Sequence, residues 1–259
     1  MPEQSPTGRF VWYELMTTDP QAAQSFYTDV IGWTTAPFEN AETPYTLWMN
    51  GEAPVGGVME LPPEARAHDT PPHWMAYVEV DDVDATAKKA GKLGGKLLVE
   101  PRDIPNVGRF AILQDPQGAA IAIHRSEQGM AGNGEPQVGQ FSWHELATTD
   151  HEAAFDFYSK LFGWNETDAV DMGEMGTYQM YGQGDVPLGG MFNKTPEMPG
   201  PPSWLYYTRV DDIDRTVEKV REKGGQVLNG PMEVPGGDRI AQCLDPQGAM
   251  FAVHARADS

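Results

Sequence analysis

The chain has little cysteine, few basic residues and no long apolar run, and each shortage excludes a class of protein. Cys243 is the only cysteine, so we expect no intramolecular disulfide and no thiolate metal cluster, and a reducing cytosol is the simplest compartment. The 18 basic residues against 38 acidic ones give a formal net charge of −20. A field of that sign repels nucleic-acid phosphates and anionic membranes.

Targeting and membrane segments are not expected either. No apolar stretch approaches the ~20 residues of a membrane-spanning helix. The N-terminal MPEQSPTGRF has neither an apolar core nor a cleavage-site pattern, so we expect no signal peptide. The sequence therefore predicts a cytoplasmic protein that binds neither nucleic acid nor membrane.

One segment of the chain occurs twice. Residues 10–33 read FVWYELMTTDPQAAQSFYTDVIGW, and residues 141–164 read FSWHELATTDHEAAFDFYSKLFGW. At an offset of about 130 residues the halves also share a Gly-Gly pair, a Pro-Pro pair before a tryptophan, a Val-Asp-Asp step and an Asp-Pro-Gln-Gly turn, which indicates duplication of a whole domain. We expect a first domain at 1–125, a polar, glycine-rich linker at 126–139 and a second domain at 140–259.

Each half is predicted to contain the order strand, helix and three strands twice. Asp19 suits a helix N-cap and Pro20 a first helical position, and the second helix is expected to run from Asp81 or Asp82 to about Lys92. The segment Leu61–Pro72 is interpreted as a loop. First-half strands are expected at Phe10–Met16, Thr34–Glu39, Tyr45–Met49, Val55–Met59, His73–Val80, Lys96–Val99, Arg109–Leu113 and Ala119–His124. Helices that alternate with runs of strands favour an α+β fold with mixed, curved sheets over a doubly wound parallel sheet.

These motifs together resemble those of the vicinal oxygen chelate superfamily, which includes glyoxalase I, bleomycin resistance proteins and extradiol dioxygenases. The resemblance covers nearly the whole chain. It implies four βαβββ modules paired into two glyoxalase-like domains, with curved mixed sheets around open cavities. In metal-dependent members it also implies one divalent ion, held by His, Gln or Glu side chains from the first and last strands of each unit.

The positions to which the resemblance assigns metal ligands carry other residues here. They are Trp12 and Trp143 on first strands, the two Gly-Gly pairs on fourth strands, Met75 and Leu205 on the next strands, and Ala122 and Ala252 on last strands. Indole, aliphatic and glycine positions lack the donors that a catalytic divalent ion needs. We therefore predict no metal or other cofactor. A divalent metal is expected only if the strand register is misread, and the ligands to test would then be the nearby histidines and the two strand glutamates.

Alternation along the strands suggests what replaces the metal. Glu14 shares a face with Trp12, and Glu145 shares one with Trp143, while His124 and His254 lie two residues after the last-strand alanines. We predict two carboxylate–imidazole pairs, Glu14 with His124 and Glu145 with His254. Such a pair can bind a polar group or act as a general base. The alternative is a structural ion pair, or a histidine at a strand end in solvent.

Aromatic side chains are the second candidate set. Alternating strand aromatics form either a core or a stacking surface for a flat or apolar ligand. The predicted ligand-binding residues are Trp12, Trp48, Trp74, Tyr77, Trp143, Tyr178, Trp204 and Tyr207. His73 and His144 have no counterpart in the other half, and we expect them to face a helix or the surface. The Gly-Gly pairs precede no helix and indicate a β-bulge or a close backbone approach.

These features predict a cytosolic protein that binds a small, partly apolar or aromatic molecule without the family metal, as a monomer or homodimer. The alternative is a glyoxalase-like lyase or isomerase, or a dioxygenase, that uses a divalent metal or a Glu–His pair. Whether the protein is an enzyme stays open at this point. A third reading is a structural or regulatory partner protein.

Overall fold

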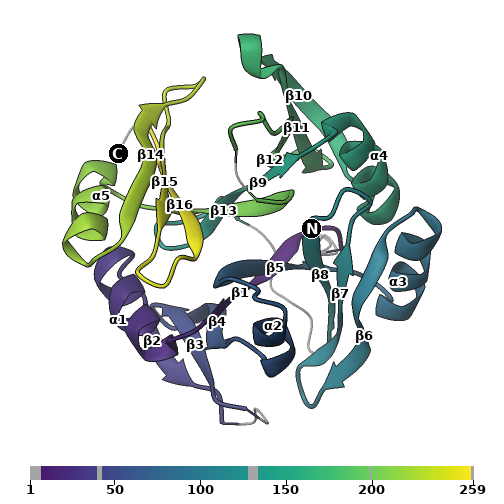
Figure 1. The fold of residues 1–259 in the computed structure, drawn as a ribbon, viewed down its shortest axis with the longest axis horizontal. Helices are drawn as coiled ribbons and strands as arrows, with labels where there is room; N and C mark the ends of the chain where they lie inside the picture. Colours follow the sequence, from purple (N-terminus) through teal and green to yellow (C-terminus); the bar gives the residue numbers. More distant parts are fainter. Residues whose placement is uncertain (1–6, 40–42, 128–133, 199, 258–259) are drawn as a thin grey trace. The chain divides into compact units, whose positions relative to one another are not determined.

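The computed structural model describes residues 7–39, 43–127, 134–198 and 200–257 (Figure 1). The predicted absence of a signal peptide and part of the predicted linker, residues 128–133, concern segments outside these ranges. The described residues form two eight-stranded mixed sheets, and neither strand order closes on itself. This confirms the predicted α+β class. No helix in the described ranges is long and apolar enough to cross a bilayer.

Both sheets follow the same order. The first contains β2 (Thr34–Pro37), β3 (Tyr45–Asn50), β4 (Ala53–Glu60), β1 (Phe10–Thr17), β5 (His73–Glu79), β8 (Ala120–Ser126), β7 (Gly108–Gln114) and β6 (Lys96–Ile104). The second contains β10 (Asn165–Asp171), β11 (Thr177–Gln183), β12 (Val186–Asn193), β9 (Phe141–Thr148), β13 (Ser203–Arg209), β16 (Met250–Ala255), β15 (Arg239–Leu244) and β14 (Gln226–Glu233). The helices are α1 (Pro20–Val30), α2 (Pro63–Ala67), α3 (Val83–Lys92), α4 (His151–Phe162) and α5 (Ile213–Glu222), with a 3-10 turn at Gly173–Met175.

The predicted helix starts are confirmed by the capping geometry. Asp19 accepts a hydrogen bond from the backbone N–H of Ala22 at 3.0 Å, and Pro20 is the first helical residue. The other three long helices have the same cap, with the aspartates at positions 82, 150 and 212. A carboxylate at this position satisfies a backbone donor that the helix itself leaves unpaired.

One local prediction was wrong, and one predicted strand was too short. The predicted loop Leu61–Pro72 contains the short helix α2, whose side chains are all at least partly exposed, so no apolar stripe signals it. The strand predicted at Lys96–Val99 continues as β6 to Ile104, past Pro101. β6 is an edge strand with irregular pairing to β7, and an edge is where a strand tolerates proline.

The chain groups into two compact units, and each unit takes segments from both repeats. Unit 1 comprises Met1–Trp12, Ala76–Gly134 and Trp143–Trp204, and unit 2 comprises Tyr13–Met75, Glu135–Ser142 and Leu205–Ser259. In unit 1, α3 packs beside α4, and in unit 2, α1 packs beside α5. The predicted domain boundaries follow the repeat along the chain and stay a prediction.

A hydrogen-bonded tyrosine lies at the centre of unit 1. The hydroxyl of Tyr158 in α4 accepts a hydrogen bond from Trp204 Nε1 at 3.2 Å and donates one to Asp115 Oδ2 at 3.0 Å. The other oxygen of Asp115 accepts the backbone N–H groups of residues 117, 118 and 119, which closes the Asp-Pro-Gln-Gly turn. The turn comes from the first repeat and the helix from the second, so this chain of bonds joins the two repeats within the unit.

Unit 2 contains the equivalent arrangement. Tyr27 in α1 accepts from Trp74 Nε1 at 2.9 Å and donates to Asp245 Oδ2 at 3.2 Å. Burial, with the nearby Asp245 as a second cause, raises the pKa of Tyr27 well above its usual range, so the phenol keeps the proton that it donates. Burial also raises the pKa of Asp245, against the hydrogen bonds that it accepts.

Replacing this tyrosine should destabilise the protein. Tyr158→Phe removes one hydroxyl and leaves both the Trp204 indole and an Asp115 oxygen without that partner, so we expect a loss of about 1–3 kcal/mol in the free energy of unfolding by urea titration. Tyr27→Phe should act in the same direction. Thr17→Val is the control, because the buried Thr17 Oγ1 has no hydrogen-bond partner among the described residues. Equal losses in Tyr158→Phe and Thr17→Val would contradict this account.

Candidate functional site

Within unit 1, strands β9, β11 and β12 present one face to α4 and one face away from it. On β9, His144 and Leu146 are buried on the helix side, while Trp143 and Glu145 lie on the other face because side chains alternate. Gly190 of β12 pairs with Glu145 and with Met180 of β11, so all three lie in one row across the sheet. This face, which we call the open face, carries three residues predicted from the sequence: Trp143, Glu145 and Tyr178.

A directional chain of hydrogen bonds connects these three side chains. Trp143 Nε1 donates to the hydroxyl of Tyr178 at 2.8 Å, and this hydroxyl donates to Glu145 Oε2 at 3.0 Å. Burial and then the charge of Glu145 raise the pKa of Tyr178 well above its usual range. The phenol is therefore a fixed donor, and Glu145 accepts its hydrogen bond.

Apolar side chains surround this polar row. The ring of Tyr178 is stacked on that of Phe192, with centroids 6.0 Å apart and an interplanar angle of 20°. Trp143, Tyr178, Met180 and Ala147 are all half-buried, whereas Glu145 is 9% exposed. A carboxylate among half-exposed aromatic and aliphatic groups is suited to a ligand with both an apolar body and a polar group.

His124 has a carboxylate partner that sequence reasoning missed. Glu79 in β5 pairs with His124 in β8 along the parallel ladder, and its Oε2 lies 3.2 Å from His124 Nδ1. The Glu79 side chain is fully buried and also accepts the backbone N–H of Ser126 at 3.1 Å. The sequence offered one sign of this pair, since Glu79 and His124 each lie near the end of a predicted strand. Comparison of the two repeats did not point to the pair, because the residue equivalent to Glu79 in the second repeat is Arg209.

His254, the equivalent of His124, has different partners, because Arg209 stands where the first repeat has Glu79. In unit 2 its Nε2 lies 2.8 Å from Asp238 Oδ2, and its Nδ1 lies 2.9 Å from Ser142 Oγ. Arg209 instead donates to the carbonyl of Pro136 at 2.6 Å. The pairs predicted from the sequence, Glu14 with His124 and Glu145 with His254, stay predictions. In the structure each of these histidines lies beside another acidic residue, and Glu145 accepts from the hydroxyl of Tyr178.

Comparison with protein families matches both halves of the chain. The model of the Glyoxalase/Bleomycin resistance protein/Dioxygenase superfamily matches residues 9–123 and again 140–253. The chain belongs to this family. Its two tandem glyoxalase domains therefore account for the repeat found in the sequence, and the predicted resemblance is confirmed.

Two curated relatives match the chain over almost its whole length. A protein of Mycobacterium tuberculosis named "Putative glyoxylase CFP32" is 35% identical over 93% of this chain and 92% of its own length. The "Anthracycline biosynthesis protein DnrV" of Streptomyces peucetius is 33% identical over 95% of this chain and 92% of its own length.

Solved structures share the glyoxalase fold at low sequence identity. A Mn(II)-bound glyoxalase from Novosphingobium aromaticivorans has a TM-score of 0.66 and 16% identity, and covers 98% of this chain and 85% of its own. An extradiol ring-cleaving dioxygenase from B. fuscum has a TM-score of 0.68 and 15% identity over 98% of this chain and 73% of its own. At these identities the likeness shows the fold alone.

The positions at which glyoxalase-family members hold a metal do not carry suitable donors here. The indole nitrogen of Trp143 is a donor only and is bonded to Tyr178. Gly190 has no side chain, and Ala122 is a fully buried methyl group opposite Tyr77. Across the described ranges, no group of three or more His, Cys, Asp and Glu side chains is placed to hold a metal ion. The residues at these positions do not fit a divalent ion.

Several predicted ligand-binding aromatics belong to the cores of the two units. Trp204 packs edge-on against Tyr158 in unit 1, with centroids 5.3 Å apart, and Trp74 does the same against Tyr27 in unit 2. Trp48, Tyr77 and Tyr207 are also buried. Trp12, Trp143 and Tyr178 are the members of the predicted set that keep partial exposure.

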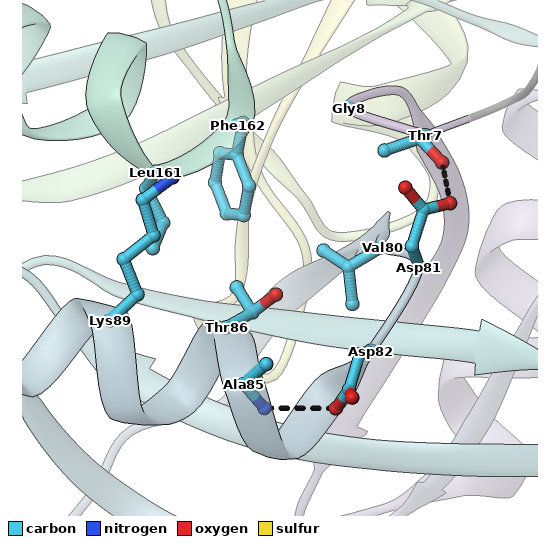
Figure 2. Close-up of a pocket in the computed structure, with 10 residues that line it drawn as sticks. All are labelled: Thr7, Gly8, Val80, Asp81, Asp82, Ala85, Thr86, Lys89, Leu161 and Phe162. Carbon is cyan, nitrogen blue, oxygen red and sulfur yellow. Dashed lines mark hydrogen bonds between the residues drawn. The ribbon is translucent and has the colours of Figure 1, made fainter.

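A separate pocket of about 250 Å³ lies in unit 1 at the start of α3, beside the C-terminal end of α4. Figure 2 shows Asp81 accepting a hydrogen bond from the Thr7 hydroxyl, at 2.7 Å, and Asp82 capping the helix through the Ala85 N–H, at 2.9 Å. Its acidic side chains therefore bond to the protein itself. None of the predicted site residues lines this pocket.

His144 lies on the helix-facing side of β9, as expected for a histidine outside the site. Its ring stacks on Phe10 at 3.8 Å, and its Nδ1 donates to the carbonyl of Leu188 at 2.6 Å. Burial lowers the pKa of His144 to about 4. His73 bonds through Nδ1 to the carbonyl of Pro71 at 2.8 Å, and burial lowers its pKa too.

The buried His144 should make stability depend on pH in a defined window. Its folded pKa of about 4 lies below the unfolded value of 6.5, so the unfolded chain takes up a proton that the native state does not. Stability is therefore retained above pH 6.5 and falls on acidification towards pH 4, by up to about 3 kcal/mol from this group. We expect His144→Phe to lose that part of the pH dependence in urea titrations, and the exposed His68→Gln to keep it. An unchanged slope in His144→Phe would refute the assignment.

Proposed function

We propose that this protein binds a small, partly apolar or aromatic molecule in its sheets, and that the open face of unit 1 is one such binding surface. The observation that carries the proposal is the hydrogen-bonded chain from Trp143 through Tyr178 to Glu145, with distances of 2.8 and 3.0 Å. The three residues come from two strands and form one ordered group, in which Trp143 and Tyr178 are half-buried and Glu145 is buried. Nothing in this arrangement requires a metal ion.

The direction of the chain determines what kind of polar group the ligand presents. An ionised carboxylate accepts hydrogen bonds and donates none. The group that Glu145 recognises is therefore a donor, such as a hydroxyl or an ammonium, rather than another anion. The net charge of −20 supports the same preference against anionic ligands.

The apolar part of the ligand lies, in this proposal, against the half-exposed faces of Trp143 and Met180. Aromatic rings offer large contact areas that lose little conformational entropy on binding, and they stack well on flat molecules. Trp12, Trp143 and Tyr178 remain the predicted ligand-binding aromatics with partial exposure. Glu14, His124, Glu145 and His254 remain the residues to test for an acid–base role.

A second candidate function is a glyoxalase-like lyase or isomerase, or a dioxygenase. The observation that favours it is the relative named as a putative glyoxylase, which is 35% identical over 93% of this chain. The donor-poor family metal positions count against a metal-dependent form of this activity. A metal-free form would use a carboxylate or imidazole as the base.

Compartment and assembly are part of the same proposal. The lone Cys243 is buried, and burial raises its pKa to about 12, which keeps the thiol unreactive. This is consistent with the proposed cytoplasmic location, where thiols stay reduced. We propose a monomer or homodimer with a small-molecule ligand as its partner.

Substitution of Glu145 tests the binding proposal. We use 2,3-dihydroxynaphthalene as the probe, because it is flat, apolar and carries two hydroxyl donors. In equilibrium dialysis, Glu145→Gln should weaken binding about tenfold, since it replaces a charge-assisted hydrogen bond by a neutral one. Glu14→Gln tests the equivalent glutamate of the first half. Glu152→Gln on α4 is the matched control and should leave affinity unchanged. Unaltered affinity in the double variant Glu14→Gln/Glu145→Gln would rule out the proposed role.

Metal analysis separates the two candidate functions. Untagged protein purified without chelator, and incubated with zinc, nickel, manganese or ferrous iron, should retain no ion near stoichiometry after gel filtration. The reason is that the family positions offer indole, methyl and glycine. One retained ion per half would instead support the metal-dependent lyase or dioxygenase. His73, His124, His144 and His254 would then be replaced one at a time to find the ligands.

A further inference from the structure

The Gly-Gly pair of each repeat has two separate steric roles. A Cβ at the first glycine, Gly189, would overlap the carbonyl oxygen of His144 in the neighbouring strand β9. In unit 2, a Cβ at Gly56 would overlap the carbonyl oxygen of Tyr13 in the same way. The first glycine thus permits the close backbone approach predicted from the sequence, which is a structural role.

The second glycine lies beneath a tyrosine ring. A Cβ at Gly190 would overlap Cε1 and Cζ of Tyr178, and a Cβ at Gly57 would overlap the ring of Tyr45. Tyr45 and Tyr178 occupy equivalent places in the two repeats, each in the strand that pairs with the glycine strand. The absence of a side chain at Gly190 therefore creates the space that the Tyr178 ring fills.

The ring of Tyr178 is confined on both sides by this arrangement. Gly190 lies under it, and Phe192 stacks beside it. With the ring held in that place, one hydroxyl accepts from Trp143 and donates to Glu145 at the same time. Two good hydrogen bonds on one oxygen need a fixed ring position, because their strength falls steeply with distance and angle.

We propose that Gly190 is a positioning residue for ligand binding, which acts only through Tyr178 by holding its hydroxyl between Trp143 and Glu145. In unit 2, Gly57 likewise leaves the space that the ring of Tyr45 fills. The inference rests on the proposed binding function for its effect on affinity, but the effect on the Tyr178 hydroxyl does not depend on any ligand. A methyl group at position 190 displaces the ring from the sheet, breaks both bonds and places the ring where the ligand lies.

A double-mutant cycle with Tyr178 tests this route of action. By equilibrium dialysis with 2,3-dihydroxynaphthalene, Gly190→Ala should lower affinity at least tenfold in the wild-type background. In the Tyr178→Ala background the same change should alter affinity less than twofold, because the ring that it displaces is gone. Gly91→Ala is the control, since a Cβ there meets nothing within 4 Å. Equal effects in both backgrounds, or no effect in the wild type, would overturn the proposal.

A ligand-free signal separates this inference from the proposed function. The near-UV circular dichroism signal of the ordered Trp143 indole is the difference between a protein with Trp143 and the same protein with Trp143→Phe. This difference should be smaller in the Tyr178→Phe background than in the wild type, because the hydroxyl that holds the indole is gone. It should be smaller by the same amount in the Gly190→Ala background. A Trp143 signal that survives Gly190→Ala would refute the positioning role even if no probe binds. Loss of the signal without probe binding in the wild type would refute only the binding function.

Discussion

The buried Trp–Tyr–Asp hydrogen bonds are the interactions on which the rest of the structure depends. In unit 1, Tyr158 stands on a helix of the second repeat and donates to Asp115 in a turn of the first. A phenol, indole or carboxylate that lost its partner in this core would carry the desolvation cost of a buried, unsatisfied polar group. The three groups therefore specify one arrangement. Unit 2 uses Tyr27 and Asp245 in the same way. The duplicated sequence thus gives two units that each need both copies.

The two repeats differ in the polar side chains that bond to equivalent histidines. Glu79 in unit 1 binds His124, and its equivalent in unit 2 is Arg209, beside which His254 bonds to Asp238 instead. The parts that recur are those that build the fold: the caps, the tyrosines and the glycine pairs. The open face of unit 1 combines both kinds of position. Its Trp143 and Glu145 recur in the first half, and they are joined by a tyrosine whose ring position depends on a glycine.

In unit 1 the core lies on the helix side of the sheet, and the open face lies on the other side. The family positions for metal donors lie on strands whose backbone pairing is maintained by the core on the helix side. At two of these positions the chain carries Trp143 and Gly190, and both lie on the open face. What the open face retains is a carboxylate with an ordered hydrogen-bond donor and apolar neighbours. The proposed binding function rests on that set of side chains.

The sequence by itself determined what depends on neighbours in the chain: helix caps, strand alternation, the Asp-Pro-Gln-Gly turn, the family and the α+β class. From alternating strand positions it also predicted Trp143, Tyr178 and Glu145 as site residues, and that role stays a prediction. Only the tertiary structure decided which side chains meet. His124 bonds to Glu79, 45 residues away, and Trp143 to Tyr178, 35 residues away. Local pattern gives a side chain's face, but its partner depends on which strands pair and how closely their backbones approach.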